Sequence, residues 1–331
     1  MSQSEVVQSG NDEPSVETVQ RLFARMREQA DKVVVGQERA FEALVVSLLV
    51  GGNVLLEGVP GTAKTLMAKT LALLVSGEFR RVQFTPDLMP SDIVGTNVFD
   101  INTSRFTLRR GPIFCSLLLA DEINRAPAKT QSALLESMEE AQVTIEGTRY
   151  PLPPTFMVVA TQNPVEYEGT YPLPEAQLDR FLFKVLIDYS PDAVEQEVLR
   201  RYHRGFDPHN LTAADLHPIA DEPSILAARA VVQTVKVDDA VLAYIGAIGR
   251  ETRKSPDVLL GSSIRGSIAL LQASKALAAM RGRDYVVPDD VKELVYPTMR
   301  HRIILKPEAE VEGLSADDVL GRSLARLEVP R

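Results

Sequence analysis

Short apolar runs alternate with helical patterns through the first 190 or so residues of this 331-residue chain. Apolar side chains three and four residues apart, among them Val19, Leu22 and Met26, predict a helix over 15–30. A second helix is predicted over 37–49. Five largely apolar runs then predict strands: 53–57, 81–84, 114–120, 156–161 and 181–187.

Helical patterns between the predicted strands, notably 64–75 and 129–138, indicate the fold class. Strands that are apolar throughout and alternate with helices are typical of a mostly parallel sheet with helices on both faces. We therefore expect an α/β domain over 15–188. Two stretches, 94–110 and 143–152, place turn residues between short β-like runs and predict protruding hairpins. Spacing alone leaves ordinary surface loops as an equal alternative.

Beyond residue 188 the strand signals nearly disappear. Ser190-Pro191-Asp192 resembles a cap for a helix that ends near His203. Further helical patterns lie near 224–234, 240–253, 263–281 and 289–294. We expect a separate all-α domain over 189–331. Residues 1–14 carry three acids and no Lys or Arg, which indicates a disordered acidic tail rather than a secretory signal.

Composition narrows the class of protein. The net charge of -9 argues against a general affinity for nucleic acid, which normally needs a basic face. No run reaches the roughly 18–20 apolar residues of a membrane span. Cys115 is the one cysteine, so a disulfide within the chain is impossible and a reducing compartment fits best. We expect Cys115 to be a buried core residue of a cytoplasmic protein.

A phosphate-binding motif follows the strand predicted over 53–57 and opens the helix predicted over 64–75. In it Lys64 would reach the β- and γ-phosphates of a nucleotide, and Thr65 would offer its hydroxyl to Mg²⁺. Ala63 replaces the usual second glycine, which is acceptable if this residue has helical dihedrals. Alone, the motif leaves open a glycine-rich turn without a ligand. Its residues are Gly58, Val59, Pro60, Gly61, Thr62, Ala63, Lys64 and Thr65.

Polar side chains end two other predicted strands. Asp121 follows the run 114–120 and is placed to hold Mg²⁺, while Glu122 is the candidate general base. A solvated strand end is the alternative, and the motif some sixty residues earlier favours the functional interpretation. Asn163 follows the run 156–161 and could orient water or contact the γ-phosphate. On local sequence alone, a turn-forming Asn-Pro pair is favoured there.

Together these segments resemble the MoxR family of AAA+ ATPases over about residues 20–320. The resemblance implies a P-loop NTPase module of the AAA+ type, followed by a helical lid domain. It also implies that ATP and Mg²⁺ are the cofactors. The segments that carry it are 34–37, 58–65 with its alanine, 121–127, 160–164 and 173–181.

The resemblance assigns further roles. Val35 and Gly36 would lie against adenine, and Asn163 takes the sensor-1 position. Arg180 takes the arginine-finger position, acting on the nucleotide of the neighbouring subunit. Arg265 resembles the sensor-2 arginine of the lid. The hairpins over 94–110 and 143–152 resemble the helix-2 and pre-sensor-1 insertions.

Local patterns add two expectations to these roles. Ile264, Ile268 and Leu271 are predicted to form a buried stripe, with Arg265 off it. Arg125 is a candidate only, because it could contact a neighbouring subunit or pair with a local acid.

The implied function is ATP-driven remodelling or maturation of protein complexes by a ring, with six subunits as the family expectation. A partner with a von Willebrand factor A (VWA) domain is implied, whereas the client protein is not. Three alternatives stay open: a nucleotide-gated scaffold, a chelatase-type motor subunit and a DNA-directed AAA+ protein. The Asp121–Glu122 pair and Arg180 speak against the scaffold, and the acidic charge speaks against DNA.

Overall fold

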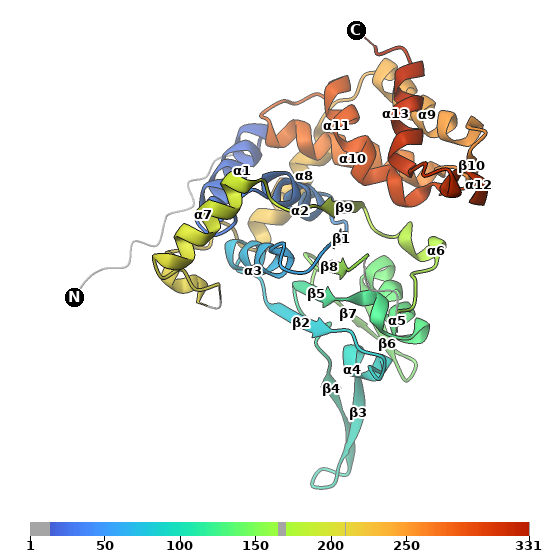
Figure 1. The fold of residues 1–331 in the computed structure, drawn as a ribbon. Coiled ribbons are helices and arrows are strands. Elements are labelled where there is room, and N and C mark those ends of the chain that lie inside the picture. The colour runs from blue at the N-terminus through green and yellow to red at the C-terminus, as the bar shows by residue number, and fades with distance from the viewer. Residues whose placement is uncertain (1–13, 165–169, 209, 331) are drawn as a thin grey trace.

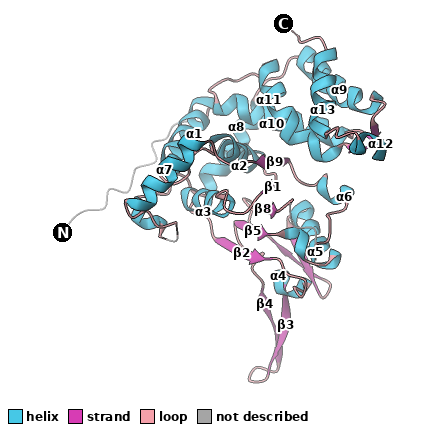
Figure 2. Ribbon diagram, viewed as in Figure 1, coloured by secondary structure: helices cyan, strands magenta, loops and turns pink. Residues whose placement is uncertain are grey.

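Five parallel strands form the central sheet, in the order β2-β5-β8-β1-β9 (Figures 1 and 2). The computed structural model describes residues 14–164, 170–208 and 210–330, so the predicted tail, apart from Pro14, lies outside the described residues. Each predicted strand takes part in the sheet, with ends displaced by up to three residues. The strands are β1 (Val54–Gly58), β2 (Phe79–Gln83), β5 (Leu117–Asp121), β8 (Met157–Gln162) and β9 (Phe183–Ile187).

Both faces of this sheet are covered by helices. Leu56 and Leu119 belong to an apolar cluster with side chains of α1–α3, whereas Leu55 and Leu118 belong to a second cluster with those of α4 and α5. Alternate residues of one strand thus enter opposite cores, which is why these strands are apolar throughout. The predicted α/β class is confirmed. The helices are α1 (Val16–Asp31), α2 (Glu38–Val50), α3 (Lys64–Leu74), α4 (Pro90–Val94) and α5 (Ala128–Glu140).

The segment before β5 is apolar without being a strand. Phe114–Ser116 were predicted as its beginning, but β5 starts at Leu117. Cys115 packs in the second cluster, and burial raises the pKa of its thiol to about 12. The prediction of a buried core cysteine is confirmed. The segment before β5 is therefore apolar because it is buried, and not because it pairs as a strand.

Two hairpins leave the sheet where the sequence predicts them. β3 (Gly95–Asp100) pairs antiparallel with β4 (Arg105–Arg110), and this hairpin reaches far below the sheet in Figure 1. β6 (Gln142–Ile145) pairs antiparallel with β7 (Thr148–Pro151). Ordinary surface loops are therefore the wrong alternative. The two hairpins are linked, since Asn97 Nδ2 donates to Glu146 Oε2 at 2.8 Å.

The rest of the chain is mostly helical, as expected. Its first helix begins at Asp192 with Pro191 at the cap position and no side-chain cap, so Ser190 does not cap it as predicted. The first apolar cluster runs on from α1 and α2 into α8, α10 and α11. The elements are α6 (Glu175–Leu178), α7 (Asp192–His203), α8 (Glu222–Thr234), α9 (Asp239–Lys254), β10 (Val258–Leu260), α10 (Ile264–Met280), α11 (Pro288–Met299), β11 (Ile304–Leu305), α12 (Pro307–Val311) and α13 (Ala316–Arg326).

The buried face of α10 differs from the predicted one. Ile264 and Ile268 are 70% and 47% exposed, so the predicted stripe is wrong at these two positions, whereas Leu271 is partly buried and packs against the core. Small side chains, among them Ala269 and Ala273, face the core beside Leu270 instead. Small residues permit close helix packing. Because they are only weakly hydrophobic, a prediction based on large apolar side chains such as isoleucine does not identify the buried face.

Among the described residues, none of the helices combines the length and the apolar character needed to cross a bilayer.

Candidate functional site

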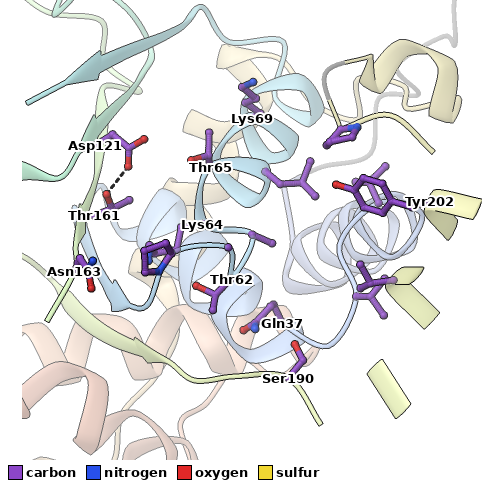
Figure 3. Close-up of a pocket in the computed structure, with 18 of the residues that line it drawn as sticks. Gln37, Thr62, Lys64, Thr65, Lys69, Asp121, Thr161, Asn163, Ser190 and Tyr202 are labelled. Atoms are coloured by element: carbon purple, nitrogen blue, oxygen red, sulfur yellow. Dashed lines mark hydrogen bonds between the residues drawn. The ribbon is translucent and has the colours of Figure 1, made fainter. Parts of the chain in front are cut away.

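A cavity of about 450 Å³ lies at the carboxyl ends of β1, β5 and β8 (Figure 3). The crevice beyond the carboxyl ends of parallel strands is where open α/β sheets bind ligands. The turn after β1, the segment before α2, and α7 with the residues after it complete the walls. The predicted site residues that line this cavity are Val35, Pro60, Gly61, Thr62, Ala63, Lys64, Thr65, Asp121, Glu122 and Asn163.

The turn between β1 and α3 curls around Lys64. The ammonium Nζ donates to the carbonyl oxygens of Gly58 at 2.5 Å and Val59 at 2.8 Å. Gly61 has a φ of +84°, and a Cβ built there would meet no atom within 4 Å, so the turn leaves open space. That space adjoins the amino end of α3, where free N–H groups and the helix dipole favour an anion.

Partial burial changes the electrostatics of Lys64. Desolvation lowers the pKa of its ammonium, while the negative charges of Asp121 and Glu122 act in the opposite direction. A cation in a partly desolvated cavity interacts more strongly with an added anion than one in bulk water. Lys64 is therefore well suited to bind phosphate.

Ala63 has a backbone that the sequence does not predict. It has φ +62° and ψ +16°, the left-handed region, and it precedes α3 as its cap. The condition under which alanine is readily acceptable here, helical dihedrals, is therefore not met. The left-handed conformation costs a residue with a Cβ roughly 1–2 kcal/mol, which explains why glycine is usual at this position.

Thr161 joins the two acids at the end of β5. Its Oγ1 donates to Asp121 Oδ1 at 2.5 Å and accepts from the Glu122 backbone N–H at 2.9 Å. Glu122 has φ +55° and ψ +51°, an uncommon backbone for a side chain of this size. The carboxylate of Glu122 accepts hydrogen bonds from Gln83 at 2.7 Å and Arg125 at 2.9 Å. The two adjacent acids thus have different side-chain partners.

Arg81 on β2 pairs with Asp121. Its Nε and Nη2 donate to Asp121 Oδ2 at 3.0 and 2.7 Å. Sequence reasoning singled out neither Arg81 nor Thr161, because their relation to Asp121 depends on strand order. β2 and β8 flank β5 in the sheet, and only that order brings their polar ends to one carboxylate.

The end of the cavity away from the acids is partly apolar. Val33 and Val35 line it from the segment before α2, and Tyr202 and Phe206 line it from α7 and the residues after it. The two aromatic rings contact edge to face, with centroids 5.7 Å apart. A flat apolar base could be held there. Gly36 does not line the cavity, and its N–H donates to Glu38 Oε1 at 3.2 Å.

Arg180 and Arg265 do not line this cavity. Both guanidinium groups bind Glu139 near the end of α5, Arg180 Nε at 3.1 Å from Oε2 and Arg265 Nη2 at 3.0 Å from Oε1. In Figure 1, α7 lies on the left of the sheet, whereas α6, which precedes Arg180, lies on the right. Arg265, which resembles the sensor-2 arginine of the lid, does not face the cavity of its own chain in this structure, because its guanidinium lies against Glu139 and Asp179.

Arg125 binds a local acid. Its Nη1 lies 2.9 Å from Glu122 Oε2, three residues earlier in the chain. Of the two alternatives that the sequence left open, local pairing is the one found in this structure.

The donor set fits a magnesium nucleotide. The Thr65 hydroxyl and the Asp121 carboxylate line the same cavity as Lys64 and supply oxygen ligands. Magnesium takes oxygen ligands, commonly one or two carboxylates together with phosphate oxygens. The cavity therefore offers the protein's share of such a coordination shell.

Replacing Ala63 tests the left-handed backbone. Ala63→Gly removes the strained Cβ, so the free energy of unfolding should rise or stay within about 1 kcal/mol, the usual size of a glycine effect. Ala63→Val puts a β-branched residue in the same conformation and should lower Tm. Thermal unfolding of the three proteins checks both. A valine variant as stable as the parent, beside a strongly destabilised glycine variant, would contradict this backbone.

Replacing Arg81 tests its competition with a metal ion. Arg81→Met frees Asp121 Oδ2, so half-maximal stabilisation by ATP should need about threefold less Mg²⁺, as expected for a half-exposed ion pair worth under ~1 kcal/mol. Arg80→Met is the matched control, because Arg80 pairs with Glu78 instead. Thermal shift at a series of Mg²⁺ concentrations measures the effect. A higher Mg²⁺ requirement in Arg81→Met would show that Arg81 assists binding instead.

Two family profiles match the chain. One, described as "ATPase family associated with various cellular activities (AAA)", matches residues 53–183, and one described as "AAA lid domain" matches residues 250–322. A solved structure of a candidate ATPase from Cytophaga hutchinsonii superposes with a TM-score of 0.87 at 40% identity, covering 96% of this chain and 97% of that one.

Curated proteins are similar over almost the whole length. The chain is 44% identical to the uncharacterized protein YeaC of Bacillus subtilis, over 95% of this chain and 97% of YeaC. It is 41% identical to the chaperone MoxR1 of Mycobacterium tuberculosis, over 96% of this chain and 83% of MoxR1. It is 30% identical to the protein MoxR of Methylorubrum extorquens, over 87% and 89% of the two chains. With its AAA domain followed by an AAA lid domain, the chain belongs to the MoxR family of AAA+ ATPases.

Proposed function

We propose that this protein is a Mg²⁺-dependent ATPase that hydrolyses ATP between neighbouring copies of a ring and uses the cycle to remodel or mature protein complexes. One observation carries the proposal. One cavity gathers the Lys64 ammonium with the carboxylates of Asp121 and Glu122, whereas Arg180 and Arg265 lie outside it and both bind Glu139. A site divided in this way needs a second copy to complete it.

Within one chain the proposed roles follow from the geometry. Lys64 and the N–H groups at the start of α3 bind the β- and γ-phosphates, and Thr65 with Asp121 holds the metal ion. Bound Mg²⁺ neutralises charge on the phosphates. Glu122 takes the proton of the attacking water, with Asn163 orienting that water. A metal ion held by Asp121 would compete with the Arg81 guanidinium for the same carboxylate.

We propose that Arg180 and Arg265 both act on the nucleotide of the next subunit. Glu139 offers each guanidinium one carboxylate oxygen, which resembles the way a phosphate would present two oxygens. A contact between the cavity of one copy and the arginines of the next is head-to-tail, and such contacts close into rings. Six subunits remains the expectation for this ring.

Exposed apolar side chains near Arg265 support such a contact. Leu259, Leu260, Ile264 and Ile268 precede or lie on the first turns of α10 and are 66%, 58%, 70% and 47% exposed. Contiguous exposed apolar side chains commonly mark protein interfaces. The exposed isoleucines of α10, which fill no core in one chain, would be covered in the ring.

The remaining proposals concern the partner. In the proposed organisation, residues 15–188 form the nucleotide-binding module, and residues 189–331 the lid that moves against it. The hairpin β3–β4 exposes Phe99 and Phe106 and would carry the motion to a client protein, with a VWA-domain protein as the adaptor. A cytoplasmic location fits the buried Cys115 thiol. A chelatase-type motor subunit stays the alternative, and identification of the client would distinguish the two.

Replacing the proposed base separates a working ATPase from a nucleotide-gated scaffold. Glu122→Gln should keep ATP binding and lower turnover by at least ~10²-fold, because a general base contributes on the order of 10²–10⁴-fold. Lys64→Ala should abolish binding, since it removes the charge at the phosphates. Fluorescent-nucleotide titration and phosphate release measure the two steps.

The matched control is Glu136→Gln, an exposed acid on α5 that should leave both quantities unchanged. Wild-type protein that binds ATP without turning it over would support the scaffold instead. Undiminished turnover in Glu122→Gln would remove Glu122 from the mechanism.

A further inference from the structure

Arg302 has a binding role that the catalytic scheme does not use. Its side chain is 4% exposed and follows α11 in a short 3-10 turn, 300–302. Nε donates to Asp179 Oδ1 at 2.7 Å, and Nη2 donates to the carbonyl oxygens of Asp179 at 3.1 Å and Phe181 at 2.7 Å. Nη1 donates to the carbonyl oxygens of Leu182 at 3.2 Å and of Thr298. All five N–H donors of the guanidinium are therefore engaged.

The segment that Arg302 binds is the one that carries Arg180. Asp179 and Phe181 flank Arg180 in the chain, between the four-residue helix α6 and strand β9. So short a helix has little stability of its own, so packing and hydrogen bonds must fix this segment. The neighbouring His301 adds another bond, since its Nε2–H donates to the Phe181 carbonyl at 3.0 Å. Full burial, with the charge of Arg302, holds the pKa of His301 well below its usual value, so the imidazole is neutral.

Arg302 also contacts the start of α10, which carries Arg265. A Cβ on Gly266 would lie 2.9 Å from Arg302 Cδ, so the arginine stem packs directly against the residue after Arg265. The Asp179 carboxylate joins the same group, because its second oxygen lies 3.9 Å from Arg265 Nη1. The buried side chain of Arg302 therefore contacts residues next to Arg180 and next to Arg265.

We propose that Arg302 is a positioning residue that holds Arg180 and Arg265 as a pair, in the geometry in which they meet the nucleotide of the next subunit. The proposal rests on the proposed function, because it assumes that both arginines act in trans. In this proposal Arg302 acts through Asp179 and Phe181 and not on the nucleotide itself. It couples the lid, through the turn after α11, to the segment of Arg180.

A lysine cannot replace this arginine. The guanidinium is planar and fills five hydrogen-bonding directions at once, whereas an ammonium has three donors and no fork geometry. Arg302→Met keeps an apolar stem but leaves the carbonyl oxygens of Asp179 and Phe181 without these donors. Arg180 would then sample several positions, and a displacement of about 1 Å in a catalytic group costs on the order of 10²-fold in rate.

The test uses mixed rings of full-length chains. Arg302→Met alone should lose on the order of 10²-fold in ATP turnover, while its own nucleotide affinity stays within about twofold. Mixed with Lys64→Ala, which lacks nucleotide binding but has intact arginines, turnover should recover. With random mixing, about a quarter of head-to-tail contacts combine a working cavity with working arginines. Phosphate release from the 1:1 mixture is compared with the two separate proteins.

Arg300→Met is the matched control for folding. Arg300 lies in the same turn and binds Asp317 through Nε at 3.0 Å and Nη2 at 2.7 Å, and its Nη1 donates to the Lys184 carbonyl on β9 at 3.5 Å, so its side-chain bonds go to residues outside 179–182. Its loss should lower stability without removing turnover. If Arg302→Met does not fold, as judged by circular dichroism, Asp179→Asn takes its place in the mixture. It should lose about tenfold in turnover and recover with Lys64→Ala, because it weakens the same contact with Arg302.

A parallel mixture separates the two proposals. Arg180→Ala with Lys64→Ala should recover turnover if arginines act in trans. Suppose that the mixture of Arg180→Ala with Lys64→Ala recovers turnover. The positioning role is then overturned if folded Arg302→Met alone has full turnover, or if the mixture of Arg302→Met with Lys64→Ala does not recover. The proposed function stays intact in both cases. If Arg180→Ala with Lys64→Ala fails to recover, action in trans fails, and the positioning role falls with it.

Discussion

The parallel pairing of β1, β5 and β8 is the constraint on which the candidate site depends. Parallel strands end at the same edge of a sheet, so the turn after β1 and the polar ends of β5 and β8 meet there. Thr161 fixes the relative position of β5 and β8 at this edge, because its hydroxyl donates to the Asp121 carboxylate and accepts from the Glu122 backbone N–H. Loss of that register would leave Lys64 without the carboxylates that face it.

A second constraint is that, in the proposed mechanism, one chain holds only part of the catalytic groups. Lys64 and the two acids share a cavity, while Arg180 and Arg265 share Glu139 elsewhere. The lid does not close over the cavity of its own chain with Arg265. Instead, the turn after α11 binds the segment of Arg180 through Arg302. Assembly and catalysis are thereby linked in the proposed mechanism, because a cavity without a neighbour lacks both arginines.

Much of the fold and of the candidate site could be predicted from the sequence, for reasons that differ between residues. The strands were found because burial on both faces makes them apolar, and Lys64 with Asp121 was found because each follows such a strand. Arg81 and Thr161 were missed, since their roles depend on strand order, which no local pattern contains. The left-handed backbone of Ala63 was not predicted, because the turn imposes it whatever the side chain.

The surroundings of Arg265 could not be predicted from the sequence for a related reason. A helical pattern places a residue on one face of α10 but does not say what that face meets. The exposed Ile264 and Ile268 show the same limit. Hydrophobic spacing predicted that they fill the core of this chain, whereas small residues do so, and the isoleucines remain available for contact with another copy.

The dependence of ATP turnover on protein concentration tests the central claim most directly. If the arginines come from a neighbouring copy, turnover per chain must rise with concentration and level off once rings have formed, in step with assembly followed by sedimentation. Constant turnover per chain, down to concentrations at which only single chains sediment, would contradict the divided site.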